Sequence, residues 1–474
     1  MSAKQKRIER ALAQAQGLLQ GGRAADAATL CEEILREAPH LPSALQLGAV
    51  AAFQSGDGNR ARDLLETATT QYPDDPEAHF NLGVLYQSSG ILESALGAFL
   101  RAAALAPGSA IAHYNAGTAL HELGRPGEAI AAYRRAIDAD PDYAAAHAGL
   151  AYLLRDAGQL EDALTAYDSA VALAPNDAQT QSGRGIVLQH LGRLPEAADA
   201  LRRAAALDPA YPDACTNLAD VLIEMDDAVS AVRECDRFLS RYPGDSGVLA
   251  SKVIALGESG DTEAADALVD FERFLCPTRP EPPPGFADAG ALNDALAAHM
   301  LAHPTLVDAP ASHATRNGKH TGELLGDTAA PIVAFQAMMS NAIALYKSKL
   351  GDDPAHPFVA NALDCWRLTA WSIVLQGSGG FQAPHIHPSA WLSGVYYARV
   401  PDVVSDPNAG QAGWIEFGLP SEEYHWRCRP PVRAIRPEAG LLVLFPSYFF
   451  HRTIPYDTEG TRISIAFDVL PAIS

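Results

Sequence analysis

The sequence predicts a multidomain protein in which an all-α solenoid of stacked helix pairs is followed by a β-sandwich or β-barrel domain with flanking helices. Three observations lead to this fold class. The chain has 474 residues, too many for one ordinary hydrophobic core. A 34-residue period runs through the first half. The second half instead alternates short β-forming runs with Gly- and Pro-containing turns.

Proline marks the repeat, because it recurs at intervals of 34 residues at positions 39, 73, 107, 141, 175, 209, 243 and 277. Glycine and alanine recur with the same 34-residue period at two other positions of the repeat. In one unit, a helix over 77–88 is expected to end near Gly90, since glycine readily takes the left-handed conformation that closes a helix. Ala95 lets a second helix approach the first, and Pro107 stops that second helix. About eight such hairpins over 1–277 predict a superhelical α-solenoid with a concave groove.

Thirty-four residues with Gly, Ala, an aromatic residue and Pro in these phases resemble the tetratricopeptide repeat (TPR). The resemblance implies a scaffold that binds a protein or peptide. Asn81, Asn115 and Asn217 share one phase of the first helix, with Gly149 and Gly183 in the same phase between them. In some members of this family, asparagines there line the groove and bind the backbone of an extended peptide. Because the series is interrupted, two interpretations stay open: the groove binds a peptide, or the array only dimerises or supports the second half.

The pattern changes after Pro277. Four prolines within seven residues predict a short, stiff linker over 278–285, followed by a second domain over 286–474. Apolar residues at helical spacing predict helices over 287–303 and 329–350. Strands are then expected over 392–400, 441–447 and 461–469. The last strand alternates cleanly, so Arg462 and Ser464 share one face.

Two histidines one residue apart stand in the segment FQAPHIHPS, residues 381–389. On an extended chain His385 and His387 share a face, which suits a metal site. His451 follows one strand before the last strand and can converge on them. Three ligands leave coordination positions open, and imidazoles suit iron, zinc or copper. Arg462 is a permanently charged fork suited to a carboxylate, with the Ser464 hydroxyl as a second donor.

This combination resembles the 2-oxoglutarate- and Fe(II)-dependent dioxygenases, and IRPEAGLLVLFPSYFFHRTIP is similar to their prolyl-hydroxylase branch. The resemblance covers roughly 285–474 and implies a double-stranded β-helix (jelly-roll). His385 and His451 match the family's two histidines, and Arg462 and Ser464 match the Arg-x-Ser motif that binds 2-oxoglutarate. The implied cofactors are Fe(II), 2-oxoglutarate and O₂, and ascorbate is also compatible. The implied reaction decarboxylates 2-oxoglutarate to succinate and CO₂ and hydroxylates a C–H bond.

His387 departs from the family pattern, because it stands where an acid is usual. In one interpretation the ligands are His385, His387 and His451, as in a His-x-His subfamily. In the other, two histidines hold the metal together with solvent or a remote carboxylate, and His387 lies next to the ligands without binding the metal. The candidate carboxylates are Asp402, Asp406 and Glu416. The histidines at 313, 320 and 425 are further candidates, although loop positions explain them more simply.

The sequence therefore predicts an enzyme, a 2-oxoglutarate-dependent dioxygenase that hydroxylates a protein, peptide or other substrate recruited by the repeats. The alternative is a TPR scaffold whose barrel is catalytically inactive or a cupin-like metal-binding module. The net charge of −22 argues against a nucleic-acid partner. The lack of a long apolar run or a secretory signal, together with six scattered cysteines, predicts a cytoplasmic protein without a membrane partner. The oligomeric state is left open.

Overall fold

The computed structural model describes residues 3–310, 313–376, 379–456 and 460–472. It divides the chain into two compact units, Met1–Gly192 and Arg193–Ser474. The boundary between these compact units differs from the domain boundaries predicted at 277 and 286, which mark where the sequence pattern changes. The domain boundaries stay a prediction.

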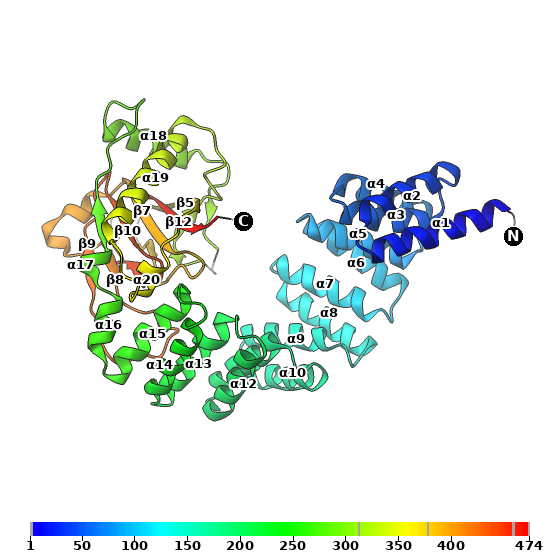
Figure 1. The fold of residues 1–474 in the computed structure, drawn as a ribbon, viewed down its shortest axis with the longest axis horizontal. Coiled ribbons are helices and arrows are strands. Elements are labelled where there is room, and N and C mark those ends of the chain that lie inside the picture. Colours follow the sequence, from blue (N-terminus) through cyan, green and yellow to red (C-terminus); the bar gives the residue numbers. More distant parts are fainter. Residues whose placement is uncertain (1–2, 311–312, 377–378, 457–459, 473–474) are drawn as a thin grey trace. The chain divides into compact units, whose positions relative to one another are not determined.

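The first unit is made of antiparallel helix pairs with short turns, drawn from blue to green in Figure 1. Its helices are α1 Ala3–Gln20, α2 Ala24–Glu37, α3 Pro42–Gln54, α4 Gly58–Gln71, α5 Pro76–Ser88, α6 Leu92–Leu105, α7 Ala110–Glu122, α8 Pro126–Ala139, α9 Ala144–Asp156, α10 Leu160–Leu173 and α11 Ala178–His190. The predicted helix over 77–88 is confirmed as α5.

Small residues let the two helices of a pair approach closely. Gly90 has φ +72° in the turn after α5, the left-handed conformation expected from the repeat pattern. Gly83 faces the ring of Phe99, and a Cβ atom at Gly83 would lie 2.6 Å from that ring. The aromatic ring of the second helix therefore occupies the space that glycine leaves free in the first.

The second unit begins with five further repeat helices and a short helical turn. These are α12 Leu194–Leu207, α13 Pro212–Glu224, α14 Ala228–Leu239, α15 Ser246–Ser259, α16 Thr262–Leu268 and α17 Phe271–Phe274. Asp226, which replaces the repeat's glycine after α13, has φ +62° and thus keeps the turn conformation with a non-glycine residue.

A seven-stranded antiparallel sheet forms the centre of the second unit, in the order β1-β10-β7-β12-β5-β4-β2. Its strands are β1 Cys276–Thr278, β2 Val307–Asp308, β4 Gly318–His320, β5 Trp366–Gln376, β7 Leu392–Arg399, β10 Leu442–Pro446 and β12 Thr461–Pro471. The central strands β7 and β12 are buried over most of their length, whereas β5 is buried at Ala370 and from Ser372 to Leu375. The three predicted strands are confirmed as β7, β10 and β12.

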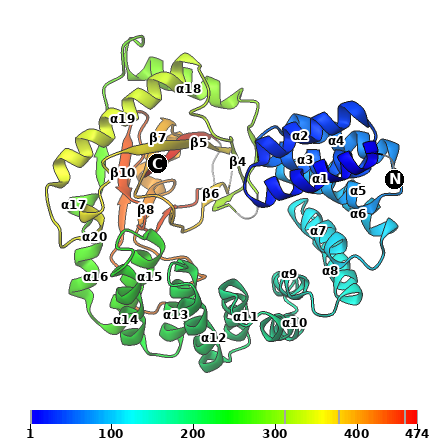
Figure 2. The same ribbon diagram turned by 45° about the vertical axis from the view of Figure 1, so that its right-hand side comes forward.

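One face of this sheet is covered by helices α18 Ala289–Leu301 and α19 Ala330–Leu350, as Figures 1 and 2 show. Phe335 of α19 packs against the rings of Tyr396 and Phe467. The Tyr396 hydroxyl donates to Asn293 Oδ1 of α18 at 2.6 Å. The two helices confirm the prediction from helical spacing, and they bury the apolar face of the sheet.

Smaller sheets complete the β-rich region. A three-stranded sheet has the order β11-β8-β9, and a two-stranded sheet pairs β3 with β6. Their bounds are β3 Thr315–Arg316, β6 Phe381–Gln382, β8 Ile415–Phe417, β9 Arg433–Ile435 and β11 His451–Thr453. The short helix α20 spans Pro357–Ala360, and 3₁₀ turns span Asp402–Ser405 and Pro407–Ala409. Repeats followed by an antiparallel β-rich region with flanking helices confirm the predicted fold class.

Polar contacts join the last repeats to the β-rich region within the second unit. Ser246 Oγ donates to the Ala390 carbonyl at 2.7 Å, and the Tyr448 hydroxyl donates to the Leu268 carbonyl at 2.5 Å. Arg427 forms an ion pair with Asp226. These contacts explain why the last repeats and the sheet belong to one compact unit. Among the described helices, none is long and apolar enough to cross a membrane.

Candidate metal centre

A cavity of about 450 Å³ lies in the β-rich region and is lined by residues of both the large and the three-stranded sheet. This volume is in the range of small-molecule sites. The lining includes His385, His387, His451 and Arg462, together with Trp371 of β5. Four residues that the sequence singled out therefore share one cavity.

Backbone hydrogen bonds hold the His385–His387 segment beside His451. His385 and His451 exchange N–H···O bonds of 3.1 and 3.0 Å, and the His387 N–H donates to the Ser447 carbonyl at 3.0 Å. His385 pairs with His451 as an isolated β-bridge, and the imidazoles of His385 and His387 stack with 5.2 Å between ring centroids. The ring centroids of His385 and His451 are 4.2 Å apart.

Each of the three imidazoles has its Nδ1 atom beside an acceptor. His385 Nδ1 lies 2.8 Å from the Ala383 carbonyl, and His451 Nδ1 lies 3.1 Å from the Phe449 carbonyl. His387 Nδ1 lies 2.6 Å from Asp468 Oδ1. Carbonyl and carboxylate oxygens only accept, so each Nδ1 donates a proton, and in the neutral imidazole Nε2 then has the free lone pair. Potential ligand atoms of the three residues lie within 4.8 Å of one another.

Burial favours the neutral form of two of these imidazoles, those of His385 and His451. It lowers the pKa of His385 to about 3, with a further contribution from the neighbouring His387 ring. Burial also holds the pKa of His451 well below its ordinary value, and the neighbouring His385 and His387 rings lower it further. Neutral imidazoles are the form that binds metal ions.

Arg462 places a buried positive charge in the same cavity, with only 1% of the residue exposed. Its Nη1 donates to the Gly413 carbonyl at 3.0 Å and its Nη2 to the Tyr397 hydroxyl at 3.3 Å. Its Nε has no hydrogen-bond partner, and no carboxylate pairs with the guanidinium, within the residues that the structure describes. Because an unpaired buried charge is costly, the cavity is suited to an anionic ligand.

Comparisons with known families agree with this geometry. Residues 369–468 match the family described as "Putative 2OG-Fe(II) oxygenase". Tetratricopeptide-repeat models match segments that together span residues 47–253. The chain is a fusion of tetratricopeptide repeats and a 2OG-Fe(II) oxygenase-like domain. The family of this oxygenase domain implies Fe(II) and 2-oxoglutarate as its cofactors.

The chain is also similar to solved repeat structures. Pseudomonas aeruginosa PilF is 16% identical, with 45% of this chain and 97% of that chain covered and a TM-score of 0.42. YrrB, a TPR protein with an unusual peptide-binding site, is 18% identical, with 39% and 95% covered and a TM-score of 0.35. MamA of Desulfovibrio magneticus RS-1 is 20% identical, with 35% and 95% covered and a TM-score of 0.33. No curated protein matches the chain.

The structure brings the predicted triad and Arg462 to one cavity of the oxygenase domain, and their roles as ligands stay a prediction. Ser464 is buried on the same face of β12, although it is not among the described residues that line the cavity. Asp402 is exposed on the first 3₁₀ turn, and Asp406 is exposed between the two turns. The Glu416 carboxylate accepts from Arg452 Nε at 2.6 Å. None of these three carboxylates joins the described cluster of potential metal ligands at the triad.

Sequence reasoning missed Asp468, which accepts hydrogen bonds from both His387 and the Ser393 hydroxyl, each at 2.6 Å. The alternation that placed Arg462 and Ser464 on one face also places Asp468 there, so the signal was present. Tyr397 was missed as well, and its ring lies 4.9 Å from the Arg462 guanidinium carbon. Tyr397 lies opposite Ser464 because of the register between β7 and β12, which only the structure shows.

Of the three remaining histidine candidates, two line the same cavity and one lies apart from it. His313 and His320 line the cavity, and burial lowers the pKa of His320 to about 4. His425 lies apart from the cavity lining, where its Nδ1 is 2.8 Å from Asp220 Oδ2 of α13.

The predicted groove asparagines are half-buried on their first helices, Asn81 on α5, Asn115 on α7 and Asn217 on α13. Asn115 Nδ2 donates to the Ile111 carbonyl of its own helix at 2.8 Å. At Gly149 a Cβ atom would lie 3.0 Å from the Tyr133 ring, and at Gly183 it would lie 2.4 Å from the Tyr167 hydroxyl. The series is interrupted because tyrosine rings occupy those two positions. Peptide binding by the asparagines stays a prediction.

Proposed function

We propose that the chain is a 2-oxoglutarate- and Fe(II)-dependent dioxygenase that hydroxylates a protein or peptide recruited by its repeats. The observation that carries this proposal is the buried Arg462, which has no described carboxylate partner and lines the same cavity as three converging imidazoles. A metal ion and an anion are the two groups for which this cavity provides partners.

The residues fit Fe(II). His385, His387 and His451 would hold it through Nε2, since each Nδ1 is directed to an oxygen acceptor. Imidazole is a suitable ligand for iron, and three protein ligands leave positions open for 2-oxoglutarate and O₂. When bound, Fe(II) supplies the redox chemistry that couples decarboxylation of 2-oxoglutarate to hydroxylation of a C–H bond.

Arg462 would bind the distal carboxylate of 2-oxoglutarate. The Gly413 carbonyl and the Tyr397 hydroxyl orient the guanidinium, and its remaining N–H donors can form charge-assisted hydrogen bonds. The Tyr397 face adds a cation–π contact that holds the group in place. The buried walls of the cavity, including Val395 and Phe445, limit the access of water to the reacting groups.

The repeats in the same chain support a protein or peptide substrate, because arrays of this kind generally bind such partners. The hydroxylated residue is left open, with proline, asparagine and aspartate as candidates.

The test uses the full chain with Fe(II) and 2-oxoglutarate, first without oxygen and then with it. We expect a visible metal-to-ligand charge-transfer band without oxygen and succinate after oxygen is admitted. In Arg462→Gln the band should vanish at 2-oxoglutarate concentrations that saturate the unsubstituted protein, because the anion loses its charged partner. Arg433→Gln, at an exposed arginine, is the matched control and should behave like the unsubstituted chain.

A protein that binds metal at the histidines but forms neither the band nor succinate would contradict the proposal. That outcome would favour a repeat scaffold with an inactive or cupin-like metal-binding barrel. Equal bands in Arg462→Gln and Arg433→Gln would instead show that Arg462 does not bind the cosubstrate.

A further inference from the structure

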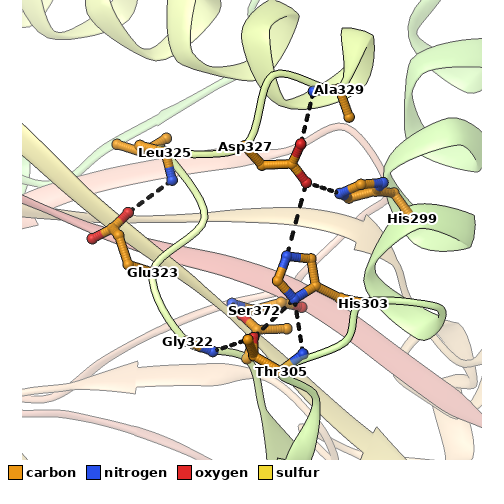
Figure 3. A network of polar contacts seen from close by, with 10 residues as sticks. His299, His303, Thr305, Gly322, Glu323, Leu325, Asp327, Ala329 and Ser372 are labelled. Atoms are coloured by element: carbon orange, nitrogen blue, oxygen red, sulfur yellow. Dashed lines mark hydrogen bonds and ion pairs between the residues drawn. The ribbon is translucent and has the colours of Figure 1, made fainter. Parts of the chain in front are cut away.

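A second group of potential metal ligands lies outside the cavity lining, at the end of α18 and the start of α19. It consists of His299 in the last turn of α18, His303 just beyond that helix, and Asp327 three residues before α19. Figure 3 shows both imidazoles directed at one oxygen of the Asp327 carboxylate. Potential ligand atoms of the three residues lie within 4.8 Å of one another.

The distances are those of an incomplete hydrogen-bonded cluster. His299 Nε2 lies 2.7 Å from Asp327 Oδ2, a normal hydrogen bond. His303 Nε2 lies 3.9 Å from the same oxygen, which is too long for a hydrogen bond. One carboxylate oxygen thus faces two imidazoles and hydrogen-bonds only one of them. A cation among the three atoms would satisfy all three.

Surrounding groups hold the cluster in place. The Ala329 N–H donates to Asp327 Oδ1 at 2.8 Å, which leaves Oδ2 for the histidines. His303 Nδ1 lies 2.8 Å from Thr305 Oγ1, and that hydroxyl also accepts the Gly322 N–H at 2.8 Å. The Thr305 backbone N–H donates to His303 Nδ1 at 3.3 Å, so the ring proton lies on Nε2, on the side of Asp327. A metal ion at Nε2 would require this proton to move to Nδ1, where the Thr305 hydroxyl can accept it. Hydrogen bonds of this kind orient the ligands in established metal sites.

We propose that His299, His303 and Asp327 form a second divalent-cation site, of the kind that binds zinc, which joins the end of α18 to the start of α19. Two imidazoles and a carboxylate are a common zinc ligand set. Zinc ligands in a tetrahedral arrangement lie roughly 3.3 Å apart, so the 2.7 and 3.9 Å separations need only small side-chain rotations. The His299 and Asp327 side chains are 24% and 29% exposed, which leaves room for a water molecule as fourth ligand.

The site is independent of the proposed oxygenase chemistry, so it can be tested in a protein whose first centre is disabled. The test protein is the full, untagged chain carrying His385→Ala and His451→Ala. Zinc affinity and stoichiometry are measured by competition with a chromophoric chelator. We expect about one equivalent of zinc to remain bound, because the second site keeps its three ligands.

Two further variants in that background locate the zinc. His299→Ala removes one ligand, and Asp327→Asn removes the negative charge while keeping an acceptor for Ala329. Each should weaken zinc binding at least about tenfold, a loss that even outer-shell changes can cause. His190→Ala, at an exposed histidine of α11, is the control and should still bind about one equivalent of zinc.

A structural readout accompanies the titration. All five tryptophans lie between residues 366 and 426, so their fluorescence reports on the domain that contains the site. Zinc should raise the midpoint of thermal unfolding in the test protein and in His190→Ala, but not in Asp327→Asn. Absence of a saturable equivalent in the test protein would overturn the proposal, whatever the folding of the variants. Equal zinc affinities in the His299→Ala and His190→Ala proteins would overturn it as well.

Discussion

At the scale of single residues, the oxygenase domain holds each clustered histidine by the nitrogen that faces away from the site. Two of the acceptors are the backbone carbonyls of Ala383 and Phe449, each of which lies two residues before the histidine that it holds. The third is the Asp468 carboxylate, which belongs to the last strand. A carboxylate that accepts from an imidazole both orients the ring and raises its basicity toward a metal.

Asp468 is therefore expected to influence metal affinity without binding the metal itself. Asp468→Asn keeps an acceptor for His387 but loses the charge, so divalent-metal affinity should fall by about 10- to 100-fold. Competition with a chromophoric chelator, using Co(II) as well as Fe(II), measures the effect. Glu416→Gln provides the comparison, because its carboxylate pairs with Arg452 and should leave metal affinity unchanged. Equal affinities in the two variants would contradict a positioning role for Asp468.

His320 carries a prediction about pH. Burial lowers its pKa to about 4 in the folded chain, against 6.5 for an ordinary histidine. As the pH falls below 6.5, the unfolded chain binds a proton that the folded chain excludes, so the free energy of unfolding decreases. Between pH 7.5 and 5.5 this one group should remove about 1 kcal/mol of stability.

His320→Gln should make the loss of stability with falling pH correspondingly shallower. Urea unfolding of the metal-free chain, followed by tryptophan fluorescence at both pH values, tests this. The chosen range stays above the sequence pI of about 5.0, where the protein would tend to associate. His190→Gln serves as the control, and an identical pH dependence in the two variants would refute the prediction.

At the scale of elements, the repeat helices depend on how glycine and aromatic residues pack between paired helices. Sequence periodicity predicts which positions carry small residues, because the same helix–helix contact recurs every 34 residues. It does not reveal which glycines contact a ring and which lie open. A Cβ atom at Gly83 would lie 2.6 Å from the Phe99 ring, whereas a Cβ atom at Gly97 of α6 would have nothing within 4 Å.

This difference predicts opposite effects of the same substitution. Gly83→Ala should lower the free energy of unfolding by about 1–3 kcal/mol, because the Cβ atom overpacks the helix pair. Gly97→Ala should raise it by roughly 0.5–1 kcal/mol, since alanine is the better helix former at an open position. Urea unfolding followed by circular dichroism compares the two variants. Destabilisation by Gly97→Ala, or no effect of Gly83→Ala, would contradict this account.

At the scale of the whole molecule, the second compact unit combines the last repeats with the β-rich region. β1 ends at the first residue of the predicted proline-rich linker and pairs with β10 at the edge of the large sheet. Glu258 of α15 accepts the backbone N–H of Cys428 at 2.6 Å, and His425 contacts Asp220 of α13. The last repeats therefore support the oxygenase domain directly.

Truncation tests this dependence. The fragment 193–474 keeps β1 and the repeat contacts, so we expect it to unfold cooperatively in urea, as monitored by tryptophan fluorescence. The fragment 286–474 begins at the predicted domain boundary and lacks β1, the Leu268 acceptor of Tyr448 and the contacts of α15. It should show a lower midpoint and a broader transition. Equal midpoints would instead support 286–474 as an independent domain.

The sequence by itself determined the repeat period, the change of pattern after Pro277, the main strands and the four candidate residues His385, His387, His451 and Arg462. These features depend on local periodicity and on residue chemistry, both of which can be recognised in a single sequence. Only the tertiary structure decided the partners of those residues. Asp468 behind His387, Tyr397 beside Arg462 and the pairing of His385 with His451 all depend on strand register between distant segments. Register is set by packing and hydrogen bonding across the sheet, which no local pattern contains.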